Sequence, residues 1–396
     1  MDTNYQVPCI QPLYKLTHSY VCRQRTVVDA TTTSTATPLQ DQVSTYYGTT
    51  LQSSSDLLTN ACCTLSGPPP DHIQNAISNI HPTVLAKYYG CGLCLPQYDL
   101  TGASILDLGC GAGRDVYIAS QLVGPTGRVV GVDMTDEQLE TATSTQEYHV
   151  KAFGFDNVEF YKGYLESLDD IAALTPGTFD VIISNCVINL CQDKKAVLEH
   201  CLTLLKPGGE LYFSDVYANR RVPQVLKDDP VLWGECLSGA LYWNDFQNLA
   251  RQVGFRDPRL VEDSPITVQS AQVQQVMDTH GAGDLKFFSA TYRLWNMPDL
   301  EPHCEDYGQA VIYKGTVPRY PSGWLLDKHH YFETGRLKTV CGNTYKMLQD
   351  STLKEYFDFV GDFSTHFGIF EGCGTSMPYD DVVGGNSAGA TKGACC

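Results

Sequence analysis

The sequence predicts a doubly wound α/β fold, in which helices cover both faces of a mostly parallel sheet. Strand-like apolar segments alternate with helical segments through the middle of the 396-residue chain. One strand runs directly into a glycine-rich turn and a helix, at 104–113 (S-I-L-D-L-G-C-G-A-G). Another, at 179–184 (F-D-V-I-I-S), is almost continuously apolar, as expected of a strand that is buried on both faces.

The glycine-rich turn is a candidate cofactor site. Gly109, Gly111 and Gly113 let the backbone turn sharply and approach a ligand closely, and the helix that follows presents free N–H groups. The next predicted strand, 128–134, ends in Asp133, where this architecture places a carboxylate for ribose hydroxyls. The pattern predicts a nucleoside-bearing cofactor; the alternative is a tight strand-to-helix turn without a ligand.

The remaining elements follow from hydrophobic spacing and from Gly and Pro breaks. Helices are predicted at 43–51, 73–84, 137–151, 194–205 and near 353–360, with a helical insertion at 222–255. Further strands are predicted at 158–161 and 211–213, and those at 259–268 and 287–294 are expected to form a final antiparallel hairpin. The regions are a flexible arm (1–40), a cofactor-binding domain (41–218), the insertion with the hairpin (219–300), a small α+β domain (301–380) and a mobile tail (381–396).

The net charge of −18 argues against two classes of partner. A surface this negative repels phosphate backbones and anionic membranes, so we expect neither nucleic acid nor membrane partners. No apolar run approaches the ~20 residues needed to cross a bilayer, and the first residues show no signal peptide. We therefore expect a cytoplasmic protein. We also expect it to be a monomer.

Sixteen cysteines are a high number for a chain expected in a reducing compartment. In that setting, thiols more often bind metals or act in catalysis than form a disulfide framework. Some are expected to be small core residues, such as Cys201 in a helical segment and Cys110 in the glycine turn. Cys91 and Cys94 have C-x-x-C spacing, but no second pair or His pair completes a zinc site.

The glycine turn favours S-adenosyl-L-methionine over a dinucleotide. The G-C-G-A-G pattern lacks the two-residue gap that precedes the last glycine of the dinucleotide fingerprint. Leu165 and Glu166 follow the third strand, where they could flank an adenine. The fourth strand and the segment 205–209 (L-K-P-G-G) match the pattern of class I methyltransferases, and the final hairpin suits that class.

A set of short stretches carries a more specific resemblance. They are Y-Y-G at 46–48, D-L-L-T-N-A-C at 56–62, Y-Y-G-C-G-L at 88–93, D-L-G-C-G-A-G-R-D at 107–115, G-V-D-M-T at 131–135, S-N-C-V-I-N-L at 184–190, G-G-E-L-Y-F-S-D-V-Y at 208–217 and W-G-E-C-L-S-G-A-L-Y-W at 233–243. Between about 41 and 300 the chain resembles the arsenite methyltransferases, which methylate trivalent arsenic with S-adenosylmethionine. The glycine motif alone would indicate only a methyltransferase.

The resemblance implies that four cysteines carry the function: Cys62, Cys91, Cys186 and Cys236. Three of them, Cys91, Cys186 and Cys236, would hold the arsenic, because converging thiolates suit a soft trivalent centre. The arsenic lone pair would then displace the methyl group of the sulfonium donor, giving mono- and dimethylated arsenicals. No general base is required at arsenic, and the protein's part is positioning and thiol ionisation.

Methyl transfer leaves arsenic formally pentavalent, so we expect a reduction step. A cysteine pair, Cys62 with one of the site thiols, would supply two electrons and become a disulfide. A thiol reductant of the glutathione or thioredoxin type would then reset the pair. The neighbouring Cys63 makes the choice of partner less certain.

The resemblance also assigns cofactor contacts. Gly109, Gly111 and Gly113 make the turn, and Asp107 orients the loop or serves as a structural cap. The other expected contacts are Asp133 (ribose), Met134 (adenine face), Leu165 and Glu166 (adenine edge), Asn185 (near the amino-acid portion) and Tyr89 (its carboxylate).

Two other functions remain open from the sequence. A methyltransferase acting on a small organic molecule would use the same cradle, but it would not need thiols at three separate motifs. A non-enzymatic arsenic or metal sensor would explain the thiols but not the cradle. The vicinal pair Cys395–Cys396 could relay electrons or bind arsenic, or could simply lie in a solvated tail.

Overall fold

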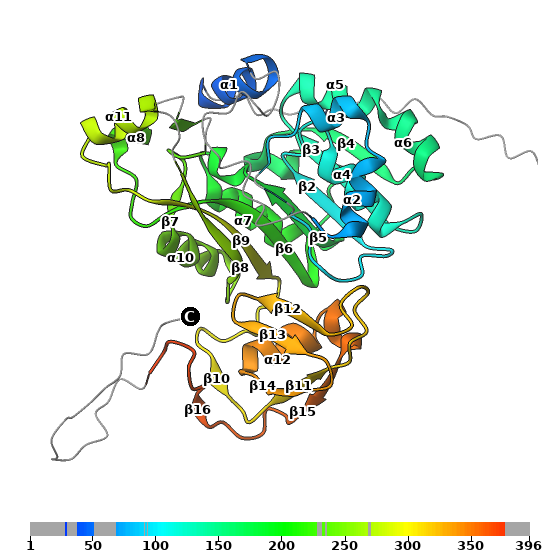
Figure 1. The fold of residues 1–396 in the computed structure, drawn as a ribbon, viewed down its shortest axis with the longest axis vertical. Coiled ribbons are helices and arrows are strands. Elements are labelled where there is room, and N and C mark those ends of the chain that lie inside the picture. The colour runs from blue at the N-terminus through cyan, green and yellow to red at the C-terminus, as the bar shows by residue number, and fades with distance from the viewer. Residues whose placement is uncertain are drawn as a thin grey trace, which may run out of the picture.

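The computed structural model describes residues 28–29, 38–50, 69–90, 92, 94–227, 232–233, 236–267 and 271–376. Its main feature is a nine-stranded sheet in the order β1-β4-β3-β2-β5-β6-β9-β8, with β7 paired to β6 (Figure 1). The pairs β6–β9 and β8–β9 are antiparallel, and the others are parallel. The strands are β1 (Val28–Asp29), β2 (Ser104–Leu108), β3 (Arg128–Asp133), β4 (Val158–Lys162), β5 (Phe179–Asn185), β6 (Leu205–Ala218), β7 (Leu241–Tyr242), β8 (Arg259–Ile266) and β9 (Phe287–Trp295). The predicted doubly wound fold is confirmed.

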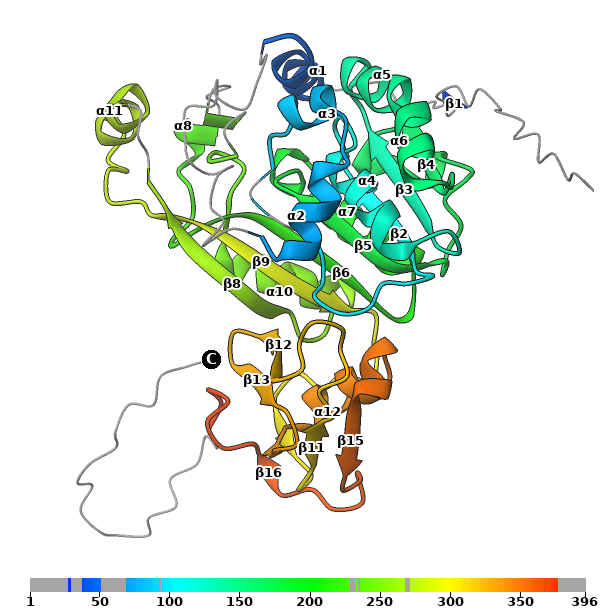
Figure 2. The ribbon, with the colours of Figure 1, turned by 45° about the vertical axis from the view of Figure 1, so that its right-hand side comes forward.

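Helices cover both faces of the sheet. Neighbouring residues of a strand point to opposite faces, so an apolar strand presents apolar side chains on both of them. Ile105 packs on the face covered by α2, α3, α4 and α5, whereas Leu106 packs against α7 and α10 (Figures 1 and 2). These helices are α2 (Asp71–Ser78), α3 (Pro82–Ala86), α4 (Arg114–Val123), α5 (Asp136–Ser144), α6 (Gln146–Phe153), α7 (Lys194–Leu204) and α10 (Trp243–Val253), with 3-10 turns η4 (Leu165–Asp170) and η5 (Ile188–Leu190). No helix in these described stretches is both long and apolar enough to cross a membrane.

Three predicted helices are divided in the structure. The first is α1 (Pro38–Thr45) followed by a π-helical turn, η1 (Tyr46–Thr50). The second breaks between α2 and α3, because Pro82 starts α3 and the His81 side chain caps it by accepting from the Thr83 N–H. The third breaks at Thr145, between α5 and α6. Most of the predicted flexible arm (1–40) and all of the predicted tail (381–396) lie outside the described residues. Leu51, the last residue of the first predicted helix, also lies outside them.

The insertion at 222–255 is not the continuous helical segment that the sequence predicts. Its described part holds the short α8 (Gln224–Lys227), a turn at 236–239, then β7 and α10. Cys236 has φ +61°, which no α-helix allows, and a Cβ at Gly239 would collide with the Asn189 carbonyl oxygen. The insertion nevertheless has its own apolar cluster, which includes both Cys186 and Cys236.

The last two strands of the sheet are antiparallel, as predicted, but they do not form a tight hairpin. Helix α11 (Ala271–Thr279) lies between them in the chain. β9 pairs with both β6 and β8, so it lies inside the sheet and β8 forms its edge.

The C-terminal part packs around a separate apolar cluster at the opposite end of the molecule from α1 (Figure 1). It contains β10 (Glu305–Asp306), β11 (Ala310–Tyr313), β12 (Gly323–Asp327), β13 (His330–Glu333), β14 (Leu337–Thr339), α12 (Gly342–Gln349), η6 (Thr352–Tyr356), β15 (Phe357–Val360) and β16 (Gly368–Ile369). The helix predicted near 353–360 is wrong, since that segment is a 3-10 turn followed by a strand paired with β11. The helix of this part is α12, which the sequence analysis missed.

Several hydrogen bonds join this part to the rest of the chain, and two of them involve Gln97 and Arg293 of β9. The Trp324 indole N–H donates to the Gln97 carbonyl at 2.6 Å. The Arg293 guanidinium donates to the Leu326 carbonyl at 2.8 Å, and it also forms an ion pair with Glu210 on β6. Glu210 lies near the start of β6, so the C-terminal part packs against the amino ends of the parallel strands.

Candidate functional site

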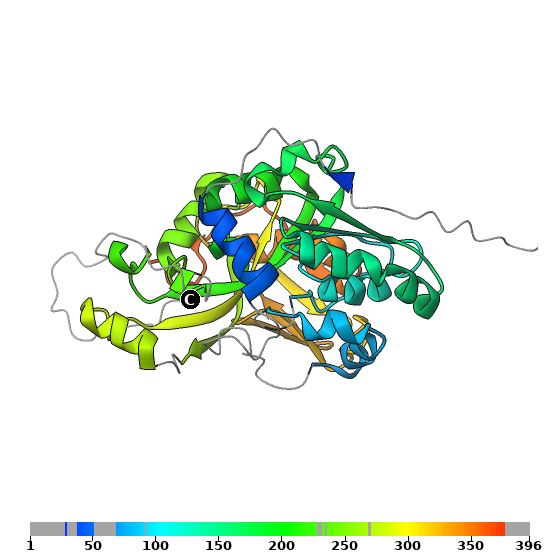
Figure 3. The ribbon, with the colours of Figure 1, turned by 90° about the horizontal axis from the view of Figure 1, so that it is seen from above.

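A cavity lies at the carboxyl ends of the central strands, where doubly wound folds bind ligands. Asp107, Asp133 and Asn185 line it from the ends of β2, β3 and β5. Val43 and Tyr47 line it from α1 and η1, and Figure 3 shows α1 lying across this end of the sheet. The parallel sheet therefore brings together side chains that are far apart in the sequence.

The three glycines of the turn play different parts. All have positive φ: +67° at Gly109, +52° at Gly111 and +87° at Gly113. A Cβ at Gly109 would collide with Val187, and a Cβ at Gly113 would press on Phe160. At Gly111 the nearest atom to a Cβ would be 3.8 Å away, so this glycine faces the open cavity. Gly113 packs against its neighbours and does not line the cavity.

Asp133 is the acidic group at the centre of the cavity. Its Oδ2 accepts from the Gly111 N–H at 2.8 Å and its Oδ1 accepts from the Thr135 N–H at 2.8 Å. Burial raises the pKa of Asp133, and burial together with the charges of Asp115 and Asp133 raises that of Asp107 well above its usual range. A carboxylate accepts several hydrogen bonds, so Asp133, which lines the cavity, is suited to a ribose hydroxyl.

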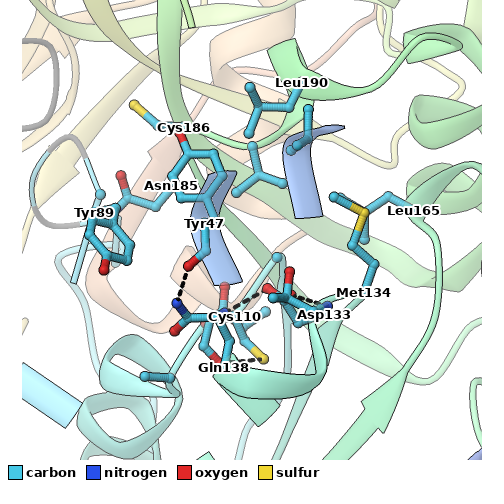
Figure 4. A pocket seen from close by; sticks show the side chains of 18 of the residues that line it. Tyr47, Tyr89, Cys110, Asp133, Met134, Gln138, Leu165, Asn185, Cys186 and Leu190 are labelled. Carbon is cyan, nitrogen blue, oxygen red and sulfur yellow. Dashed lines mark hydrogen bonds between the residues drawn. The ribbon is translucent and has the colours of Figure 1, made fainter. Parts of the chain in front are cut away.

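The cavity residues fit a nucleoside. Met134 and Leu165 provide apolar contact on one side, opposite Tyr89, Asn185 and Cys186 (Figure 4). In addition, Gln138 lines the cavity with its amide N–H₂ bonded to the Tyr47 carbonyl at 2.9 Å. Its buried Oε1 has no hydrogen-bond partner within the described part of the chain. A buried acceptor without a partner is costly, so this oxygen is suited to a donor on a ligand.

Asn185 is held by a polar network that the sequence analysis missed. Its amide nitrogen lies 2.7 Å from the Tyr88 hydroxyl oxygen and 3.0 Å from Asp115 Oδ2. Arg114 stacks on the Tyr88 ring, 3.8 Å from its centroid, and bonds Asp115 at 2.7 Å. Burial raises the pKa of Tyr88, so its phenol stays neutral. The R-D pair directly after the glycine turn was the available signal, since Arg114 and Asp115 both line the cavity.

Glu166 and Tyr89 border the same cavity. The Glu166 carboxylate accepts from the Gln40 amide at 3.2 Å and from the Gln192 N–H at 3.0 Å, so it ties α1 to the segment before α7. The Tyr89 ring packs edge-on against Tyr47 with centroids 5.6 Å apart. Both residues therefore fix the rim of the cavity whatever they contact in a ligand.

The predicted thiols fall into two groups. Cys186 follows β5, lines the cavity and is disulfide-bonded, whereas the other eight described cysteines are not in disulfides. Cys236 is buried, and its Sγ lies 3.4 Å from the Cys186 carbonyl oxygen, although it does not line the cavity. Cys62 and Cys91 lie outside the described residues.

Of the fourteen predicted site residues, ten line this one cavity. They are Tyr89, Asp107, Gly109, Gly111, Asp133, Met134, Leu165, Glu166, Asn185 and Cys186. Tyr47, Arg114, Asp115 and Gln138 also line the cavity and were not predicted as site residues. Nor were three cysteines that lie together in the C-terminal part, Cys304, Cys341 and Cys373.

Comparisons with known proteins indicate the family of this chain. A family model described as a methyltransferase domain matches residues 100–254. An arsenite methyltransferase of Aquipseudomonas alcaligenes is 55% identical over 86% of this chain and 96% of its own length. The mouse arsenite methyltransferase is 43% identical over 82% of this chain and 84% of its own length. The crystal structure of CrArsM, an arsenic(III) S-adenosylmethionine methyltransferase from Chlamydomonas reinhardtii, is 45% identical, with a TM-score of 0.72, covering 77% of this chain and all of that one. The chain therefore belongs to the arsenite methyltransferase family.

Proposed function

We propose that this chain uses S-adenosylmethionine to methylate trivalent arsenic held by cysteine thiolates, and that Cys186 and Cys236 belong to the holding set. One observation carries the proposal: Cys186 lines the cavity that fits a nucleoside, and the Cys236 thiol lies 3.4 Å from the Cys186 carbonyl oxygen. A methyltransferase for a small organic molecule has no need for thiols from two separate segments at that place.

The residues of the cavity have separable tasks. S-adenosylmethionine, when bound, supplies a methyl group on a positively charged sulfur. Asp133 and Gln138 offer acceptors for the nucleoside, and Met134 and Leu165 pack on its apolar faces. Asn185, fixed by Tyr88 and Asp115, orients the end of the cavity next to Cys186. The thiolates hold arsenic close to the methyl group of the donor. The two reactants therefore meet in a fixed geometry and do not depend on a chance collision in solution.

Arsenite exchanges its three hydroxyls for three thiols and releases three waters. The lone pair that stays on arsenic is then the nucleophile. After transfer, arsenic carries the methyl group and is formally pentavalent. A fourth thiolate, which we assign to Cys62, attacks one of the bound sulfurs and forms a disulfide, and the electron pair of the broken As–S bond returns to arsenic. Two external thiols then reduce the disulfide and become a disulfide themselves.

The disulfide at Cys186 supports this cycle. Cys186 can bind arsenic only as a free thiolate, so the arrangement described here corresponds to an oxidised site that must be reduced first. The proposal therefore includes a thiol reductant of the glutathione or thioredoxin type as co-reactant.

The direct test incubates the purified protein with arsenite, S-adenosylmethionine and a thiol reductant, and separates methylated arsenicals by chromatography with arsenic detection. Methylated products are expected with the native chain and none with Cys186→Ser or Cys236→Ser. Cys201→Ala, which removes a buried thiol from α7, is the matched control and should stay active. Titration with S-adenosylhomocysteine should show an intact cofactor cavity in both Ser variants. Full methylation by these variants would contradict the proposal.

A further inference from the structure

Three thiols of the C-terminal part lie together although they come from three separate segments. Cys304 precedes β10, Cys341 directly precedes α12, and Cys373 follows β16. Their sulfur atoms all lie within 4.8 Å of one another, and none of the three is in a disulfide. A centre with bonds of about 2.3 Å to sulfur holds its sulfur atoms roughly 4 Å apart, so this cluster needs little movement to bind one.

The backbone fixes this arrangement. β10 and β16 pair antiparallel, with Glu305 opposite Ile369. The Phe370 N–H donates to the Cys304 carbonyl at 2.8 Å, and the Cys373 N–H donates to the Phe370 carbonyl at 3.4 Å. The strand pair therefore places Cys304 and Cys373 side by side, next to the N-terminus of α12.

The surroundings favour a thiolate. The Arg259 guanidinium lies 3.9 Å from the Cys341 sulfur and also pairs with Asp257 and Asp327. Cys341 is also the N-cap residue of α12, a position whose partial positive charge stabilises thiolates. Arg259 is buried, and its Nε has no hydrogen-bond partner among the described residues.

The cluster is open to a cleft of about 600 Å³ between the C-terminal part and the β8–β9 edge of the sheet. Cys304 and Cys373 line this cleft and are half-buried, whereas Cys341 is buried behind them. A small neutral solute can therefore reach two of the thiols directly and the third from within the cluster.

We propose that Cys304, Cys341 and Cys373 form a second site for trivalent arsenic, separate from the site of methyl transfer. No further ligand atom of a described Cys, His, Asp or Glu joins the three sulfur atoms, so the set suits a three-coordinate centre with a lone pair better than tetrahedral zinc. Binding exchanges three As–OH groups for three As–S bonds, releases three waters and changes no oxidation state. Only the choice of ligand rests on the proposed function.

Position decides what this site does with arsenic. Arg259, which contacts Cys341, begins β8 and pairs with Arg293, whose own partner on β6 is Tyr212. In the sheet, β6 and β9 therefore lie between β8, which the cluster contacts, and β5, which Cys186 follows. The cavity that Cys186 lines and the cleft that Cys304 and Cys373 line share no residue. Arsenic bound here is remote from the methyl donor, so the site holds arsenic without methylating it.

The test is residue-specific, because other cysteines of this chain can also bind arsenic. The full-length reduced protein is alkylated with iodoacetamide with and without arsenite, and the labelling of each cysteine is followed by peptide mass spectrometry. Arsenite should slow the labelling of both Cys304 and Cys373, and the arsenite concentration that halves the labelling rate should be the same for the two cysteines. Cys341→Ser should raise that concentration at least about ten-fold, because loss of a direct ligand costs no less than loss of an outer-shell partner. Cys201→Ala should leave it unchanged.

Two further variants separate this inference from the proposed function. In the double variant Cys186→Ser/Cys236→Ser, arsenite should still slow the labelling of the cluster cysteines fully, although methylation is lost. In Cys373→Ser, arsenite should no longer slow the labelling of Cys304, whereas the methylation rate at saturating arsenite should stay within about two-fold of the native rate. The proposal would be overturned if arsenite did not change the rate at which Cys304 and Cys373 are labelled. It would also be overturned if these two cysteines were not labelled even in the absence of arsenite. A third contrary outcome would be that the native chain binds one zinc ion, that Cys373→Ser binds none, and that arsenite does not displace the zinc from the native chain.

Discussion

The Cys236 thiol lies 3.4 Å from the carbonyl oxygen of Cys186, and both residues have left-handed backbone conformations, with φ of +61° and +58°. Within the described residues, Arg319 is the one other non-glycine residue with positive φ. Such conformations cost about 1–3 kcal/mol each and persist where the surrounding structure enforces them, often at functional sites. Two strained cysteines in contact are therefore better explained by a shared task than by core packing.

Comparing Gly with Ala at position 236 isolates this strain. Both substitutions remove the thiol, but Gly accepts positive φ and Ala does not. We expect Cys236→Gly to be more stable than Cys236→Ala by about 1 kcal/mol, measured by urea unfolding, and both to be inactive in methylation. The matched control is Cys201, in helix α7, where Ala should be the more stable of the two. Equal stability of the two Cys236 variants would contradict the strain.

The glycine turn offers a second matched pair. Gly109→Ala places a methyl group against Val187, whereas Gly111→Ala meets no atom within 3.8 Å. We expect Gly109→Ala to lower the free energy of unfolding by about 2–4 kcal/mol, from overpacking plus backbone strain. Gly111→Ala should cost about 1 kcal/mol and chiefly weaken S-adenosylhomocysteine binding, because its methyl group enters the cavity. Thermal unfolding and calorimetric titration measure the two effects separately.

His149 gives the stability a pH dependence. The ring stacks on Tyr117 with centroids 3.5 Å apart, and Nε2 accepts from the His81 N–H at 3.1 Å. Burial lowers the pKa of His149 from 6.5 to about 4. Between these values the unfolded chain binds a proton that the folded chain does not, so this stabilisation is complete above pH 6.5 and is lost as the pH falls towards 4.

We expect the free energy of unfolding to fall across this window by up to ~3 kcal/mol from this group. His149→Gln, which keeps a donor and an acceptor, should flatten the pH profile, measured by urea unfolding at several pH values. His280→Gln, which changes an exposed histidine after α11, is the matched control. A profile for His149→Gln as steep as that of the native chain would contradict the assignment.

A buried ion pair within the sheet lies next to the junction with the C-terminal part, because Arg293 also donates to the Leu326 carbonyl. Arg293 and Glu210 are 2% and 0% exposed and bond at 2.8 and 2.9 Å, and the Tyr98 hydroxyl donates to the same carboxylate at 2.8 Å. Arg293→Met leaves a buried carboxylate without its cation, so we expect a loss of about 3–5 kcal/mol. Glu210→Gln/Arg293→Met should lose less than the sum of the single changes. Lys195→Met, in an exposed pair with Glu199, should have no measurable effect on urea unfolding.

The sequence was sufficient to predict those features that depend on the residue types within one short segment. The strands β2, β3 and β5 follow from apolar runs, and their order along the chain places Asp107, Asp133 and Asn185 at one edge of the sheet. The motifs around Cys186 and Cys236 identified the family because their residue types are unusual together. These features depend on a few neighbouring residues, which a sequence displays directly.

What the sequence did not provide depends on contacts between distant segments. The helix predicted near 353–360 failed because pairing with β11 outweighs its helical spacing. The turn at 236–239 packs against Asn189, whose carbonyl oxygen leaves no room for a Cβ at Gly239, and no local pattern reveals this contact. Likewise, Cys304, Cys341 and Cys373 share no motif, and they meet because β10 pairs with β16 beside α12.

The join between sheet and C-terminal part affects how the latter should be studied. A shortened chain that ended near residue 300 would leave the Gln97 carbonyl without the Trp324 indole and the Arg293 guanidinium without the Leu326 carbonyl. Deletion would thus damage the amino ends of the very strands whose far ends carry the donor cavity. Loss of turnover after such a deletion would report a weakened scaffold, so single-residue changes are the informative way to assign a task to this region.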